Sequence, residues 1–185
     1  MTPTTRRSFI AGGGALLGLA GCGNGLGSQG AERIDARVAS TLNFMYSEFP
    51  GTRELSNEAA GMLVMPLVTE VGLGLGGAYG RGALKVGDST VDYYSTVNVS
   101  GGLQIGAQQF AHVLFFMTNE ALFDFRNSDG WSAGADLEYA VNDQAEMLRA
   151  DTVTSLAPVI AVVFAQTGLR AGATLEGTKY TRIIP

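Results

Sequence analysis

Cysteine and histidine, whose side chains carry much of protein chemistry, occur once each in this sequence of 185 residues, as Cys22 and His112. A thiolate can act as a nucleophile or a metal ligand, and an imidazole can act as a general base or a metal ligand. One cysteine and one histidine cannot supply the usual zinc ligand set, and the carboxylates form no cluster at ligand spacing. We therefore expect no metal site and no cofactor.

His112 lies within the apolar run AHVLFFM, Ala111–Met117, where Leu114 and Phe116 share its face of a strand. The run is apolar on both faces, which predicts a central strand. No G-x-S-x-G nucleophile elbow is present in the sequence, and one histidine would have to serve as the base for any serine. A packed or edge histidine is therefore favoured over a catalytic one.

Close pairs of carboxylates are the other residues that could perform acid–base chemistry. Asp88 and Asp92 form one pair, and Asp136 and Glu138 form the other. Such chemistry usually needs an apolar pocket around one of the two acids, and neither pair lies in a recognisable one. We read both pairs as solvated surface charge and expect no enzymatic activity.

Cys22 stands at the end of an export-signal pattern. Thr5–Ile10 (TRRSFI) resembles a twin-arginine signal, and the apolar, glycine-rich run after it is too short to span a bilayer. Leu19–Cys22 (LAGC) resembles the bacterial lipobox, in which the cysteine thiol receives a diacylglycerol and the chain is cut just before it. A Sec-type signal with an incidental buried cysteine is the alternative. These patterns predict a signal peptide over 1–21, a lipidated flexible tether over 22–30 and one domain over 31–185.

Acylation of Cys22 would anchor the chain to a membrane without spanning it, since each buried methylene contributes about 0.8 kcal/mol. Gly23 follows the cysteine, at a place where lipoproteins retained at the inner membrane of enteric bacteria typically carry aspartate. We therefore expect a bacterial envelope protein at the outer membrane rather than the inner one, with its domain facing the periplasm.

The charge balance limits the partners. The formal net charge is −5, and removal of residues 1–21 leaves 10 basic and 17 acidic residues, a balance of −7. Non-specific binding to nucleic acid needs a basic footprint, so we expect none. Binding to anionic lipid would need a local basic cluster.

Helices are predicted ahead of a β-rich region. Apolar residues recur at helical spacing from Ala31 to Phe49, and Pro50 ends the pattern. A shorter helix is predicted over Thr52–Ala60, and a third, inserted among the strands, over Asn119–Arg126.

The remaining apolar patterns predict strands over Met62–Val68, a glycine-rich run from Val71, Ala83–Val86, Asp92–Val99, Leu103–Gln109, Ala111–Met117, Ala133–Val141, Val159–Gln166 and Leu169–Tyr180. Pro66 indicates an edge strand or a bulge, because proline cannot donate to a strand ladder. The class is α+β: N-terminal helices followed by a coiled, largely antiparallel β-sheet or partly closed barrel, with one inserted helix.

The most regular stretch runs from Val71 to Gln109. Gly72, Gly74 and Gly76 alternate with aliphatic residues, so one face of a single strand would be bare backbone. Such a face implies a close neighbour, which could be a crossing helix, a sharply coiled sheet or an apolar ligand. Gly72, Gly74 and Gly77 also match G-x-G-x-x-G, but that fingerprint must open a helix and the β pattern continues here.

Six residues are candidates for contact with lipid: Arg81, Lys85, Arg126, Trp131, Arg170 and Lys179. The basic ones could converge in a β-rich fold to form an anion patch, with ordinary surface scatter as the alternative. Trp131 follows a turn and could lie at a membrane interface or stack on a ligand, with a position in the core as the alternative.

From about Ala60 to Ile184, the chain resembles the SYLF domain. Four segments in the same order carry the resemblance: GMLVMPLVTEVGLGLGGAYGRGAL, YYSTVNVSGGLQIGAQ, FFMTNEALFDFRNSDGW and FAQTGLRAGATLEGTKYTRI. The resemblance implies a module that binds phospholipids, phosphoinositides among them in eukaryotic members, and that performs no catalysis.

Two functions follow as expectations. The first is a non-enzymatic envelope lipoprotein, tethered through acylated Cys22, whose SYLF domain binds phospholipid. The alternative is an envelope scaffold or interaction protein that binds a protein partner and has no intrinsic lipid affinity.

Overall fold

The structure is a computed structural model that describes residues 29–73, 76–100, 105–133, 137–139, 157–165, 168–169, 175 and 177–185. The predicted signal peptide, Cys22, Asp136 and Arg170 lie outside these residues. In the part of the chain that is described, no helix is long and apolar enough to cross a membrane.

Two helices precede the sheet, as the apolar spacing predicts. Helix α1 (Gly30–Glu48) buries one stripe of side chains at helical spacing: Ile34, Val38, Leu42 and Met45. Helix α2 (Thr52–Glu58) follows after Pro50 and ends two residues before the predicted boundary, because Ala59 is already extended. Helix α3 (Asn119–Asn127) is inserted among the strands, and the Thr118 side chain accepts a hydrogen bond from the Ala121 amide to cap it.

The strands form one curled sheet. Its members are β1 (Gly61–Leu73), β2 (Gly76–Val86), β3 (Ser89–Ser100), β4 (Ile105–Phe116), β5 (Trp131–Ser132), β6 (Leu137–Tyr139), β7 (Val159–Ala165), β8 (Gly168–Leu169) and β9 (Lys179–Ile183). The strand order is β5-β9-β3-β2-β1-β4-β7-β6, and β8 also pairs with β7. Only the β6–β7 pairing is parallel among the described strands. The predicted α+β class with a coiled, largely antiparallel sheet and one inserted helix is confirmed.

The glycine-rich run is a hairpin, so the prediction of one strand with a bare face is wrong. β1 ends at Leu73, β2 begins at Gly76, and Gly72 lies opposite Gly76 across the hairpin. Alternating glycines therefore lie on two strands. The segments Leu103–Gln109 and Ala111–Met117, predicted as separate strands, likewise belong largely to the single strand β4, which lies between β1 and β7.

Pro66 lies at a bulge in a central strand, so the bulge interpretation is confirmed and the edge interpretation is wrong. The register of β1 shifts beside Pro66 against both neighbours, between Val64 and Leu67 on the β2 side and between Met65 and Val68 on the β4 side. Gly82 of β2 lies against this bulge. A side chain there would clash with the Val64 carbonyl oxygen and lie 2.5 Å from Met65 Sδ.

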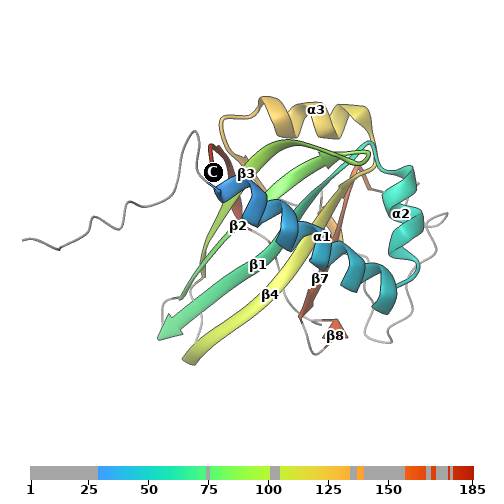
Figure 1. Cartoon of the computed structure of the whole chain (residues 1–185). Helices are drawn as coiled ribbons and strands as arrows, with labels where there is room; N and C mark the ends of the chain where they lie inside the picture. Colours follow the sequence, from blue (N-terminus) through green and yellow to red (C-terminus); the bar gives the residue numbers. More distant parts are fainter. Residues whose placement is uncertain are drawn as a thin grey trace, which may run out of the picture.

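The two faces of the sheet carry separate cores. On the outer face, α1 packs over β1, β4 and β7, burying Val64, Val113 and Phe164 among others. Figure 1 shows α1 crossing this face while β1 and β4 run on beyond it. The inner face curls around a second core that includes Leu63, Leu114, Phe116, Phe125 of α3 and Tyr180 of β9.

The contact between His112 and Tyr180 shows that the sheet is curled. The Nε2 atom of His112 lies 2.8 Å from the hydroxyl of Tyr180, and both side chains are fully buried. β4 and β9 are separated by β1, β2 and β3, so in a flat sheet they would lie roughly 19 Å apart. The sheet must therefore bend around its inner core to bring these two strands together.

Gly82→Ala should destabilise the fold strongly, by about 3 kcal/mol or more, because the added methyl group meets the backbone of the bulge. Gly77→Ala is the matched control on the same strand, since its methyl group would lie 3.7 Å from the Asn98 carbonyl oxygen. Urea unfolding of both variants measures the difference. Equal stability of the two variants would contradict the close contact at the bulge.

His112 should make the fold sensitive to acid. Burial lowers the pKa of His112 to about 3 from its usual 6.5, so between these values the unfolded chain binds a proton that the folded chain does not. The free energy of unfolding should fall as the pH is lowered from 6.5 to 3, by up to about 1.4 kcal/mol per pH unit from this residue. His112→Gln should have a shallower slope in unfolding measured from pH 7 to 4. Parallel slopes for both proteins would refute the assignment.

Candidate functional site

The outer face of the sheet is only partly covered. α1 lies over the half of this face that contains Met62, Val64 and Ala83, where the side chains are buried. Beyond the bulge, β1, β2 and β3 continue toward the β1–β2 hairpin, and the side chains on the same face become exposed. In the part of the chain that the structure describes, no helix covers this stretch of the sheet surface.

Strand register brings the exposed side chains together. Tyr79 lies opposite Val97 on β3, and Val71 and Val99 flank Gly77 in the adjacent row. Leu67 completes the set one row nearer to α1, opposite Arg81. We call Leu67, Val71, Tyr79, Val97 and Val99 the uncovered face. Val99 is the most open of the five, at 80% exposed, and Leu67 the least, at 37%.

Two cationic side chains border the uncovered face. Arg81 lies between Leu67 and Ser95 in one row, and Lys179 of β9 lies opposite Val97 in the next. Contiguous exposed apolar side chains next to cations are typical of a surface that meets a lipid head-group layer or another protein. Two of the six predicted contact residues are therefore close to one surface, although the chain as a whole is acidic.

The other predicted contact residues lie elsewhere. Arg126 on α3 forms an ion pair with Asp92, 3.0 Å from Nη2 to Oδ2, and Arg182 lies 3.5 Å from the same carboxylate. Trp131 lies against the inner core, where its ring contacts the rings of Phe125 and Tyr180 at centroid distances of 5.5 and 5.7 Å.

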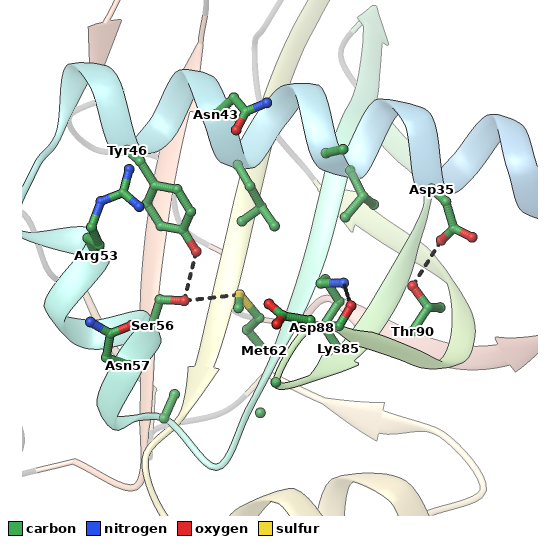
Figure 2. Close-up of a pocket in the computed structure, with 16 residues that line it drawn as sticks. Asp35, Asn43, Tyr46, Arg53, Ser56, Asn57, Met62, Lys85, Asp88 and Thr90 are labelled. Atoms are coloured by element: carbon green, nitrogen blue, oxygen red, sulfur yellow. Dashed lines mark hydrogen bonds between the residues drawn. The ribbon is translucent and has the colours of Figure 1, made fainter.

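Lys85 borders a groove of about 770 Å³ between α1, α2 and the β2–β3 turn (Figure 2). Its Nζ atom donates a 2.7 Å hydrogen bond to the Asp88 carbonyl oxygen. On the other side of the groove, the Tyr46 hydroxyl and Ser56 Oγ are 2.7 Å apart, and the Arg53 guanidinium lies 4.6 Å from the centre of the Tyr46 ring.

Asp35 holds the first part of α1 against β3 at the remaining edge of this groove. Its two carboxylate oxygens accept hydrogen bonds from Thr90 Oγ1 at 3.0 Å and from the Tyr93 hydroxyl at 2.8 Å. Burial and the Asp35 carboxylate raise the pKa of Tyr93 to about 12, so this phenol stays protonated and donates. Several polar side chains of the groove thus form hydrogen bonds with one another and hold the helices on the sheet.

His112 and Ser56, two side chains that could carry acid–base chemistry, both have polar neighbours at hydrogen-bond distance. Among the residues that the structure describes, no group of three or more histidine, cysteine, aspartate or glutamate side chains could hold a metal ion. His112 is buried, and its Nε2 atom is engaged by Tyr180. Ser56 in the groove has Tyr46 and Met62 Sδ as its bonded neighbours, and neither is a general base of ordinary strength.

The residues of the uncovered face were not among those that the sequence predicted as contact residues. The selection there rested on charge and on the single tryptophan, whereas the face is built from aliphatic side chains and one tyrosine. The available signal was the alternation of Val91, Val97 and Val99 with polar residues in β3. That pattern predicts an apolar face but does not reveal whether a helix covers it.

Comparison with known proteins gives one family. Residues 97–182 match the model of the Ysc84 family, described as Las17-binding protein actin regulator, and a search of curated proteins found no match. The matched segment contains the end of β3, β4, α3, β7 and β9, and therefore both ends of the His112–Tyr180 contact. The match supports a lipid-binding family related to membranes or actin. Residues 97–182 thus carry a match to the Ysc84 (SYLF) domain, in agreement with the resemblance noted in the sequence.

Proposed function

We propose that this chain is a non-enzymatic, membrane-anchored envelope lipoprotein whose SYLF domain binds phospholipid through the uncovered face. One observation carries the proposal: five exposed apolar side chains lie in adjacent rows of the sheet, next to Arg81 and Lys179. The apolar side chains would enter the head-group layer, and the two cations would lie level with the phosphates.

The strength of this contact is modest by itself. Complete burial of a large aliphatic side chain contributes about 1.5–3 kcal/mol, and the four aliphatic side chains and Tyr79 of this face are already partly covered. Each cation near an anionic bilayer adds about 1 kcal/mol. The domain alone would therefore bind a bilayer reversibly, and a covalent lipid would be needed for stable residence.

The predicted tether suits this arrangement. Cys22 precedes Gly30, the first residue of α1, by eight residues, which can span at most roughly 28 Å. α1 begins beside β3, to which Asp35 holds it, and the uncovered face includes the far part of the same strand. An acyl anchor on Cys22 would raise the local concentration of the face at the bilayer surface. We place the anchored domain at the outer membrane, facing the periplasm.

A second candidate is an interaction protein. The Ysc84 family is described as Las17-binding and actin-regulating, and these are interactions with other proteins. The same uncovered face could then contact a protein, with the acyl group as the sole link to the membrane. A pull-down with the native chain and with Cys22→Ala distinguishes the two functions: a stable protein partner without any affinity of the domain for lipid favours the interaction protein.

Charged substitutions on the uncovered face should reduce membrane binding. In a Cys22→Ala background, which removes the predicted acylation site, Tyr79→Asp with Val99→Asp should weaken flotation with phosphatidylglycerol-containing vesicles at least tenfold. The reason is the loss of about 2 kcal/mol or more of apolar contact together with two added negative charges.

Phe123→Asp is the matched control, because Phe123 is an apolar side chain on α3 with 66% exposure and lies outside the uncovered face. This variant should float like its parent. If the parent protein does not float with vesicles of any composition, the proposed function is disproved. An equal loss for the control variant would show that the uncovered face has no special role.

A further inference from the structure

A narrow apolar crevice of about 360 Å³ lies on the side of α1 opposite to the groove of Figure 2. It lies along the edge where the helix meets β1, β4 and β7. The residues that line it are Ser40, Thr41, Phe44, Pro66, Leu67, Gln109, Phe110, Ala111, Phe164 and Ala165. Its volume is at the lower end of the range for small-molecule sites.

The bulge and small side chains keep this space open. The β1 register shift at Pro66 bends the strand beside the helix. Ala111 lies opposite Phe164 on the neighbouring strand and contributes only a methyl group to the floor. Phe44 stacks on Phe164 with ring centroids 5.9 Å apart, so an aromatic wall closes one side.

The crevice is continuous with the uncovered face through Leu67, which lines the first and belongs to the second. An apolar chain could therefore pass from a bilayer at the uncovered face into the crevice along apolar side chains. Arg81 lies directly opposite Leu67 in the strand register, on the same face of the sheet. An anionic group attached to that chain would thus meet a cation at the mouth of the crevice.

The groove on the other side of α1 is more polar than the crevice. Four of its polar side chains, Asp35, Tyr46, Ser56 and Lys85, form hydrogen bonds with their neighbours. The crevice has hydroxyl groups along the helix, at Ser40 and Thr41, and opposite them lie aromatic and aliphatic residues together with Gln109. Of these two spaces beside α1, the crevice is the one built for an apolar guest.

We propose that the crevice binds one acyl chain of a membrane phospholipid with an anionic head group, and that Arg81 contacts the phosphate. The inference rests on the proposed phospholipid binding and adds to it: the uncovered face meets the bilayer surface, and the crevice takes a single chain out of it. The bound lipid is then held by the domain as well as by the bilayer.

The test uses the full chain carrying Cys22→Ala and a lysophosphatidylglycerol with a 12-carbon chain, kept below its micelle concentration. Isothermal titration should show binding at one site. Thr41→Trp places a large side chain at the rim of the crevice and should weaken this binding at least tenfold. Ala36→Trp is the matched control, because residue 36 is an exposed position on the same helix that does not line the crevice. Arg81→Gln should weaken binding of the lysophospholipid and leave binding of an uncharged alkyl glucoside unchanged.

A measurement on the parent protein makes the test independent of variants. In amide NMR spectra, the lysophospholipid should shift the signals of Thr41 and Ala111 and leave those of Asn43 and Ser56, which line the groove, in place. Shifts confined to the groove, or unaltered affinity in Thr41→Trp, would overturn the crevice site. Flotation with vesicles but no binding of the lysophospholipid would overturn it too and leave the proposed function intact, whereas failure of both assays would remove both proposals.

Discussion

The contact between His112 Nε2 and the Tyr180 hydroxyl, 2.8 Å long, joins two strands that three other strands separate in the sheet. It fixes the curl on which the rest of the structure depends. A curled sheet encloses its inner core with its own strands and α3, so that core needs no further covering layer. The outer face becomes convex, and α1, which has 19 residues and spans roughly 28 Å, covers only part of it. An exposed stretch of sheet beyond the helix is the geometric consequence.

α1 divides the outer face into regions of different chemistry. On one side is the groove, where several polar side chains form hydrogen bonds with one another and hold the helices in place. On the other side is the crevice, which is lined mainly by aromatic and aliphatic side chains and opens at Leu67 onto the uncovered face. The bulge at Pro66 links these features, because it both forces a glycine at position 82 and bends β1 beside the crevice. The proposed membrane contact thus depends on how far α1 extends over the sheet.

The sequence predicted those elements that local periodicity determines. The buried stripe of α1 and the packed position of His112 both follow from the spacing of apolar residues. The glycine run was assigned to one strand because Gly72, Gly74 and Gly76 keep the same alternation across a tight hairpin. Charge and residue type predict Trp131 as a contact residue. Its ring instead packs against Phe125 and Tyr180, which come from distant segments of the chain, so the sequence pattern near Trp131 does not reveal this packing. The uncovered face could not be predicted, since exposure of Val97 and Val99 depends on the length and placement of α1.

The central claim is that the uncovered face, and no other surface, meets the bilayer. Removal of Cys22 leaves a chain without cysteine, so Val99→Cys in the Cys22→Ala background can carry a single nitrobenzoxadiazole label, and Phe123→Cys on α3 can carry the same label as a control. The account predicts that nitroxide-labelled phospholipids in anionic vesicles quench the label at position 99 and shift its emission to the blue, while the label at position 123 behaves as in solution. Quenching at position 123, or an absence of quenching at position 99, would contradict it.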